Sequence, residues 1–161
     1  MVPRLCSMDY GAPVTNSRYE EEDPNYIYGI VSSLSKDCGS SLVAIGWNRP
    51  NGKIDYLCGG SLINDDFVLT AAHCAVDEFN IAPNTVRIGD TDLGSEKDDE
   101  FAKQIAIGRI IVHPQYRGSR KYFDLALIQL AEPIKYSMAV CRACLWRESS
   151  LPPERMDAIG F

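Results

Sequence analysis

The sequence contains two histidines, and one of them lies in a segment that could support proton-transfer chemistry. This residue, His73, is the fifth residue of LTAAHC (residues 69–74), where two small alanines precede it and Cys74 follows it. An imidazole changes charge near neutral pH, so it can accept a proton from an attacking hydroxyl and return it to a leaving group. The residue types leave three interpretations open for His73: a general base, a zinc ligand or a packed side chain.

A zinc site at His73 would need further nitrogen or sulfur ligands at a suitable spacing. The adjacent Cys74 is expected to point in a different direction, and the sequence has no helical His-x-x-x-His pair. Cys141 and Cys144 form the one Cys-x-x-Cys spacing, and no second pair completes a four-ligand site. The sequence therefore argues against zinc.

The cysteine content indicates disulfides. Six cysteines in 161 residues are typical of a protein from an oxidising compartment, and spacing alone does not select among their many pairings. Residues 1–20, however, lack the apolar stretch of about 7–15 residues that a secretory signal peptide requires. The sequence as it stands therefore predicts disulfides but shows no signal for export by that route.

Charge and hydropathy exclude two classes of partner. The chain carries 22 acidic against 16 basic residues, a net charge of -6, whereas nucleic-acid binding needs a concentrated basic surface. No segment approaches the roughly 20 consecutive apolar residues of a membrane-spanning helix. We therefore expect neither nucleic acid nor a membrane as a partner.

From about residue 41 the sequence shows short apolar runs separated by turn residues, a rhythm typical of all-β proteins. Strands are predicted over residues 41–47, 53–63, 66–70, 85–90, 102–113 and 125–130. Asn51 and Gly52 join the first two and can supply the positive φ angles of a tight hairpin turn. The segment TAAHC is too short for more than one helical turn. Six strands without a long helix favour a small antiparallel barrel or sandwich.

The N-terminal residues have a different character. Residues 1–29 contain three prolines and the acidic run EEED, without a periodic apolar pattern. This composition is typical of a linker rather than of a packed domain.

Three segments carry a resemblance to a known family. LCGGSLINDDFVLTAAHC (residues 57–74) resembles the histidine segment of chymotrypsin- and trypsin-like serine proteases, and YFDLALIQLAEPI (122–134) resembles their aspartate segment. VCRACLW (140–146) is similar to the stretch that connects their two domains. The segments occur in the family's order, the resemblance covers about residues 41–161, and the insect clip-domain branch looks nearest.

The resemblance implies an all-β fold, in which this chain forms the N-terminal six-stranded antiparallel β-barrel half of the chymotrypsin-like double-barrel fold. It implies a pro-segment-like linker over residues 1–29 and a partial trypsin-like peptidase domain over residues 30–161. His73 would then be the general base, and Asp124 the carboxylate that orients it and stabilises the imidazolium ion. The second histidine, His113, matches a framework position of the family and is expected to be structural.

The nucleophile that such a base requires is missing from the sequence. In the family the nucleophilic serine lies in a Gly-Asp-Ser-Gly-Gly loop, and no such motif follows Asp124. Ser61 belongs to a predicted strand, and no glycine flanks the serines beyond Asp124, which are Ser137, Ser149 and Ser150. We therefore expect a serine-type endopeptidase whose second barrel, with nucleophile, oxyanion hole and specificity pocket, is missing, so that this chain alone is inactive. The alternative is a secreted non-catalytic homologue that binds partners in a protease cascade.

The resemblance also implies disulfides and a location. It pairs Cys58 with Cys74, and it pairs Cys144 with a cysteine of the pro-segment, for which Cys6 is the candidate by position. Cys38 and Cys141 remain, and they are either paired with each other or free thiols. The family and the cysteine content together predict an extracellular protein, although the sequence shows no signal peptide.

Calcium is the one cofactor that the resemblance suggests. Some family members bind calcium in the loop that corresponds to GDTDLGSEKDDEF (residues 89–101), where Asp90 and Glu100 would be the carboxylate ligands. The spacing in this loop is not that of an EF-hand. The expected partners are protein substrates or cascade proteins, together with the missing second barrel.

Overall fold

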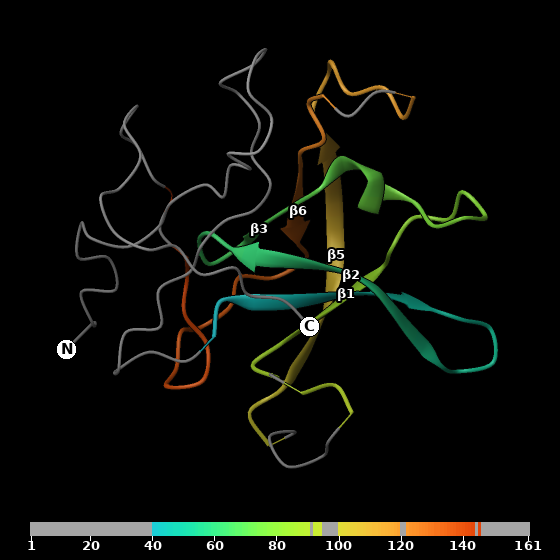
Figure 1. Cartoon of the computed structure of the whole chain (residues 1–161). Helices are drawn as coiled ribbons and strands as arrows, with labels where there is room; N and C mark the ends of the chain where they lie inside the picture. Colours follow the sequence, from blue (N-terminus) through green and yellow to red (C-terminus); the bar gives the residue numbers. More distant parts are fainter. Residues whose placement is uncertain (1–39, 91, 95–99, 120–121, 144, 146–161) are drawn as a thin grey trace.

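The computed structural model describes residues 40–90, 92–94, 100–119, 122–143 and 145 (Figure 1). The predicted linker lies outside these residues, as do three of the cysteines, which are Cys6, Cys38 and Cys144. The predicted pairing of Cys6 with Cys144 therefore lies outside the described residues as well.

The described residues form a closed antiparallel barrel of six strands. The strands are β1 (Leu42–Asn48), β2 (Ile54–Leu62), β3 (Phe67–Thr70), β4 (Thr85–Ile88), β5 (Lys103–Val112) and β6 (Ala126–Leu130). One 3-10 turn, η1 (Ala72–Ala75), follows β3. The order around the barrel is β1-β2-β3-β6-β5-β4. The all-β prediction of six antiparallel strands is confirmed, and the strands close into a barrel rather than a sandwich.

Apolar side chains from the strands fill the barrel. In β6, Ala126, Ile128 and Leu130 are buried and the residues between them are half-buried, which is the period-two pattern of a strand with one face on the core. β1 is buried continuously from Val43 to Trp47, so both of its faces are covered. Burial of one large aliphatic side chain stabilises a fold by about 1.5–3 kcal/mol. This core holds the strand ends, and the loops that follow them, in fixed positions.

The hairpin between β1 and β2 differs in detail from the prediction. Gly52 N–H donates to Arg49 O at 2.9 Å, and Arg49 N–H donates to Lys53 O at 2.8 Å. Gly52 has a φ of 80°, but Asn51 is not among the residues with positive φ. The connection is therefore a β-turn through Pro50 and Asn51, followed by a glycine bulge. Proline favours this arrangement because its fixed negative φ suits the second position of such a turn.

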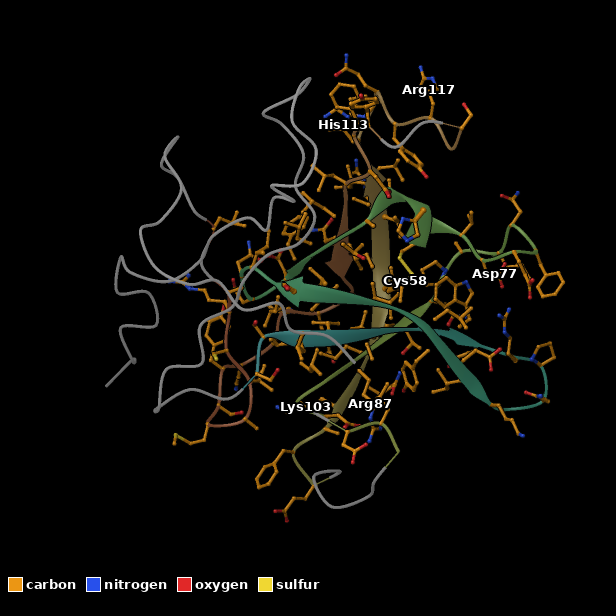
Figure 2. The ribbon with its side chains drawn as sticks, viewed as in Figure 1. Cys58, Asp77, Arg87, Lys103, His113 and Arg117 are labelled. Atoms are coloured by element: carbon orange, nitrogen blue, oxygen red, sulfur yellow. A yellow bond between two sulfur atoms is a disulfide. The ribbon has the colours of Figure 1, made fainter. Side chains whose placement is uncertain are left out.

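β5 runs from one end of the barrel to the other (Figure 2). Lys103 begins β5 and lies near Arg87 at one end, where the loop between β4 and β5 connects the strands. His113 follows β5 at the opposite end, where Val112 pairs with Ala126 at the start of β6. Asp90 and Glu100, the predicted calcium ligands, therefore lie at the opposite end of the barrel from the predicted catalytic pair.

Candidate active site

The pairing of β3 with β6 brings together two segments that are far apart in the sequence. Thr70 at the end of β3 lies opposite Ala126 at the start of β6. His73 follows Thr70 by three residues, and Asp124 precedes Ala126 by two. Because antiparallel neighbours run in opposite directions, this register places both side chains at the same end of the barrel.

The turn η1 exposes His73 and buries the residues on either side of it. Cys74 N–H donates to Ala71 O at 3.2 Å, which closes the turn. Ala72 and Cys74 are 3% and 5% exposed, whereas the side chain of His73 is 62% exposed. The small alanine therefore lets the turn pack against the barrel while the imidazole remains accessible to solvent.

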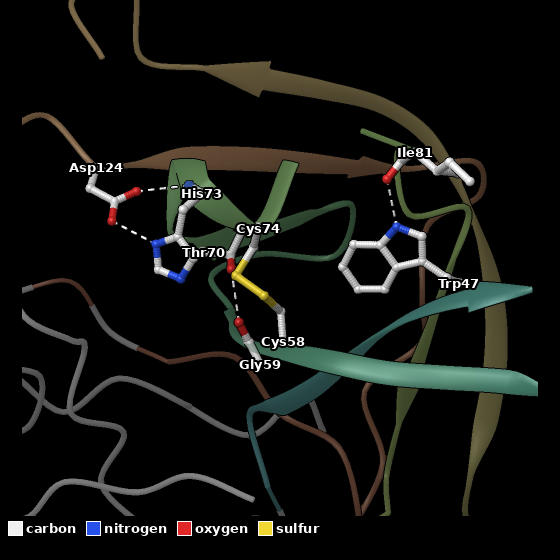
Figure 3. Close-up of a disulfide and its surroundings, with 8 residues drawn as sticks. All are labelled: Trp47, Cys58, Gly59, Thr70, His73, Cys74, Ile81 and Asp124. Atoms are coloured by element: carbon white, nitrogen blue, oxygen red, sulfur yellow. Dashed lines mark hydrogen bonds and ion pairs between the residues drawn. A yellow bond between two sulfur atoms is a disulfide. The ribbon is translucent and has the colours of Figure 1, made fainter. Parts of the chain in front are cut away.

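A disulfide ties η1 to β2 (Figure 3). Cys58 and Cys74 are joined across a sequence separation of 16 residues, which confirms the pairing that the family resemblance implied. Beside this bond, Thr70 Oγ1 donates to Gly59 O at 2.8 Å. A cross-link that closes a loop of this length stabilises a fold by about 3 kcal/mol, because it lowers the conformational entropy of the unfolded chain. The histidine turn is thus fixed at both its start and its end.

Asp124 binds His73 at two atoms (Figure 3). Its Oδ1 accepts a hydrogen bond from the backbone N–H of His73 at 2.8 Å, and its Oδ2 lies 2.7 Å from His73 Nδ1. The carboxylate therefore orients both the backbone and the imidazole ring of the same residue. Its side chain is 30% exposed, so it is only partly withdrawn from water.

This contact selects the tautomer of His73. A carboxylate accepts hydrogen bonds, so Nδ1 carries the hydrogen, and in the neutral ring the lone pair then lies on Nε2. Nε2 can accept a proton from a hydroxyl, and the resulting imidazolium ion would lie against the negative charge of Asp124. The arrangement has the chemistry of a general base with an orienting carboxylate.

A second carboxylate lies four residues beyond His73 and has different surroundings. The side chain of Asp77 is fully buried and accepts hydrogen bonds from Arg49 Nη1 at 2.7 Å, Ile81 N at 2.8 Å and Phe79 N at 3.0 Å. Arg49 also donates to Asp55 at 2.7 Å. This ion pair joins the β1–β2 hairpin to the loop that follows η1.

The charges of this ion pair are mutually stabilised. Burial by itself raises the pKa of Asp77, but hydrogen bonds from Ile81, Arg49 and Phe79 outweigh it and lower the pKa below its usual value. Hydrogen bonds to Asp55 and Asp77 raise the pKa of Arg49. Sequence reasoning missed this contact, because Arg49 and Asp77 are 28 residues apart and no local pattern connects them.

Comparison with known proteins identifies the family. The sequence model of the Trypsin family matches residues 41–161. The chain belongs to the trypsin family. The Drosophila melanogaster serine protease Hayan is 42% identical over 112 residues, covering 70% of this chain and 17% of the relative. Serine protease snk from the same organism is 36% identical over 124 residues, covering 74% of this chain and 28% of the relative.

Further relatives agree with this assignment. The CLIP domain-containing serine protease B4 of Anopheles gambiae is 38% identical over 116 residues, covering 66% of this chain and 32% of the relative. A solved structure of GrC is 28% identical with a TM-score of 0.56, covering 73% of this chain and 48% of that one. This trypsin-family chain therefore spans less than a third of each of these three relatives and about half of GrC.

The described serines of the trypsin-family chain do not supply a nucleophile next to His73. Ser61 lies within β2, opposite Leu42 and Leu69 in the ladder. Ser137 lies in a turn, where its backbone exchanges hydrogen bonds with Val140. No serine in the described part of the chain forms a hydrogen bond with His73, and the predicted candidates Ser149 and Ser150 lie outside that part.

Among the described residues, one group of potential metal ligands lies close together, and it adds Cys58 to the neighbours His73 and Cys74. The ligand atoms of Cys58, His73 and Cys74 lie within 4.8 Å of one another, although the side chain of His73 is exposed and Cys74 is buried. The two sulfur atoms, however, are bonded to each other, and zinc requires thiolates. In its disulfide form this group therefore does not offer a zinc site.

The two carboxylates predicted to bind calcium have unequal surroundings. Asp90 is 1% exposed; its Oδ2 pairs with Arg87 Nε at 2.5 Å, and its Oδ1 accepts a hydrogen bond from Asp92 N at 2.9 Å. Glu100 is exposed to solvent. Because Asp90 is already paired with a cation, the described residues do not fit a calcium ion unless Arg87 releases this carboxylate. Calcium binding stays an untested expectation of the family resemblance, and the Arg87–Asp90 pair predicts that the wild-type protein does not offer this carboxylate to the ion.

The third described cysteine is also part of a disulfide. Cys141 is disulfide-bonded, with a partner outside the described residues, so it is not one of the free thiols that the sequence left open. The described part of the chain contains no helix with the length and hydropathy of a membrane span.

Proposed function

We propose that this chain contributes the general base, His73, and the orienting carboxylate, Asp124, of a serine-type endopeptidase. The observation that carries the proposal is the double contact of one carboxylate with the backbone N–H and with Nδ1 of the same histidine. That contact occupies Nδ1 and leaves Nε2 as the free nitrogen of a largely exposed imidazole, where it can meet a reacting group.

In the proposed reaction Nε2 accepts the proton of the nucleophilic hydroxyl while its oxygen attacks the peptide carbonyl. The proton then passes from Nε2 to the amine that leaves when the peptide bond breaks. Asp124 remains ionised throughout and stabilises the imidazolium ion that forms between the two transfers.

The nucleophile is not supplied by these residues. The 161-residue sequence contains no serine in a Gly-Asp-Ser-Gly-Gly loop. A positioned base contributes about 10²–10⁴-fold to a rate, whereas enzymes accelerate their reactions by about 10⁶-fold or more. Residues 1–161 by themselves are therefore proposed to be inactive towards peptide bonds.

The proposed substrates and partners are proteins in an extracellular proteolytic cascade. Support comes from the relatives, which are serine proteases, and from the disulfides, which form in oxidising compartments. The second candidate is a secreted homologue without catalysis that binds cascade proteins. This candidate needs no nucleophile, and no serine among the described residues forms a hydrogen bond with His73.

The test uses the protein encoded by the full transcript, in wild-type form and as His73→Gln. Hydrolysis of fluorogenic peptides and casein is expected for the wild type and is expected to fall by about 10³-fold or more when the base is removed. Lys53→Gln is the matched control, because this residue lies in the exposed β1–β2 hairpin.

The same assay separates the two candidates. A folded full-length protein that hydrolyses nothing, yet binds cascade proteins with or without His73, would favour the non-catalytic homologue. Hydrolysis by residues 1–161 that persists in His73→Gln would contradict both the proposed role of His73 and the proposed inactivity of the chain.

A further inference from the structure

The residue before Asp124 has an unusual backbone conformation. Phe123 has a φ of 59°, and Asn80 is the one other non-glycine residue with positive φ in the described ranges. Asparagine tolerates this left-handed region, but a bulky aromatic residue adopts it only at a cost in free energy. Such strain persists where the surrounding structure enforces it, and it concentrates at functional sites.

Contacts on both sides of Phe123 enforce its conformation. Its ring stacks on the ring of His113, with the centroids 4.9 Å apart and the planes 8° from parallel. Leu125 N–H donates to Phe123 O at 2.7 Å, and His113 N–H donates to Leu125 O at 2.9 Å. Asp124 is thus the central residue of a three-residue turn, and His113 holds both flanking residues.

His113 is itself fixed by the turn that follows β5. Gln115 N–H lies 3.2 Å from His113 Nδ1, and Tyr116 N–H donates to His113 O at 3.0 Å. Nδ1 therefore accepts a hydrogen bond, which leaves the ring hydrogen on Nε2 in the neutral form. Burial, and then the negative charge of Asp124, raise the pKa of Tyr116, so this turn lies within electrostatic reach of the carboxylate.

We propose that the His113–Phe123 stack is a positioning device for Asp124. It fixes the strained backbone of Phe123 so that both oxygens of Asp124 reach the backbone N–H and Nδ1 of His73. The inference rests on the proposed function, and it gives His113 a role beyond the structural one that the sequence suggested. Neither ring needs to touch the substrate, because both act through the carboxylate.

The test compares two substitutions of Phe123 in the full-length protease. Phe123→Ala removes the ring, so Asp124 is expected to shift and kcat to fall by about 10–100-fold, with KM nearly unchanged. Phe123→Tyr keeps the stacking surface and is expected to restore most of the lost kcat. Phe101→Ala is the matched control, since Phe101 is an exposed aromatic residue before β5, at the opposite end of the barrel.

A second variant guards against misfolding. Phe123→Asn accepts positive φ readily but offers no aromatic ring, so it is expected to fold and still to lose kcat. His113→Ala is expected to produce the same loss, because it removes the other half of the stack.

A spectroscopic measurement separates positioning from stability. The proton on His73 Nδ1 lies in a short hydrogen bond to Asp124, so its NMR resonance reports the position of the carboxylate. We expect this resonance to shift or broaden in Phe123→Ala and Phe123→Asn, and to return in Phe123→Tyr. Variants that lower the melting temperature but retain both kcat and this resonance would overturn the proposal.

Failure of the proposed endopeptidase function can be distinguished from failure of the positioning role. If the wild-type full-length protein hydrolyses no peptide, the proposed endopeptidase fails. The His73 resonance still decides the positioning in that case: an unchanged resonance in Phe123→Ala overturns it, and a shifted one supports it.

Discussion

Asp124 contacts the histidine turn, and Asp77 follows that turn by two residues, yet the two carboxylates have opposite kinds of partner. The side chain of Asp77 is fully buried and accepts three hydrogen bonds, one of them from the permanent cation Arg49. Asp124 is 30% exposed and makes its two contacts with one residue, His73. Both carboxylates orient chain segments that are distant in sequence.

The difference shows how a fold assigns one residue type to two tasks. An arginine keeps its proton at every relevant pH, so the Asp77 pair is static and stabilises the loop after η1. A histidine gains and loses a proton near neutral pH, so the charge facing Asp124 can change during a reaction. The partner of each carboxylate therefore decides whether that carboxylate can only stabilise the fold or can also assist proton transfer.

The largest expected effect is on the proposed catalysis and comes from Asp124→Asn in the full-length protein. An amide presents a donor as well as an acceptor, so it can hold the imidazole in the wrong tautomer. We expect kcat to fall by about 10⁴-fold, the magnitude established for this exchange in the trypsin-like family, with little change in melting temperature. Steady-state kinetics and a thermal melt measure the two quantities.

Asp77→Asn is the matched exchange and should give the reverse pattern. It weakens a buried ion pair, so the melting temperature should fall while kcat of the folded protein stays nearly unchanged. A larger loss of kcat in Asp77→Asn than in Asp124→Asn would remove the distinction drawn between the two carboxylates.

The next effect concerns the disulfide that ties η1 to β2. Replacing both Cys58 and Cys74 by alanine opens a link across 16 residues and should lower the free energy of unfolding by about 3 kcal/mol. Denaturant titration of the wild type and of the double variant measures this loss. An unchanged midpoint would mean that the hydrogen bonds of Asp124, rather than the disulfide, hold the turn.

A smaller effect is expected from acid. Burial would raise the pKa of Asp77, but its hydrogen bonds lower the pKa below 3.8 in the folded protein. A carboxylate whose pKa is lower in the folded than in the unfolded protein stabilises the fold at pH values above its pKa in the unfolded chain. This contribution is lost as the pH falls through its pKa in the folded protein. The wild-type melting temperature should therefore decline below about pH 4, and less steeply in Asp77→Asn. Equal slopes in the two proteins would contradict this assignment.

The smallest expected effect is that of calcium, and it extends the comparison to a third carboxylate. Asp90, like Asp77, is buried against an arginine, so calcium or a chelator should leave the wild-type melting temperature unchanged. Arg87→Gln frees an oxygen of Asp90 and should make the melting temperature rise with calcium. A clear rise in the wild type would instead support calcium binding by Asp90 and Glu100.

Much of the fold could be predicted from local patterns. The apolar alternation of β6 and the apolar residues of β1 predict strands, and the short TAAHC segment predicts a single turn. The hairpin through Pro50 and Gly52 was located correctly, but its turn geometry was not, because Pro50 favours the second position of a β-turn and so places the turn one residue earlier than Asn51 and Gly52 alone would. These features depend on neighbouring residues.

The candidate site was only partly predictable. His73 and Asp124 were selected through family resemblance, and the structure brings them together at 2.7 Å. The Arg49–Asp77 pair and the His113–Phe123 stack had no counterpart in the sequence reasoning. Their members lie on different segments, so neither periodicity nor a turn signal links them.

The sequence by itself determined where strands form, which residues can exchange protons and which family the chain resembles. The tertiary structure alone decided which partner each polar side chain meets. The register of β3 against β6 brings His73 to Asp124 across 51 residues, and the hairpin brings Arg49 to Asp77 across 28. The physical reason is that strand patterns depend on local spacing, whereas these contacts depend on barrel closure, which is set by the packing of the whole core.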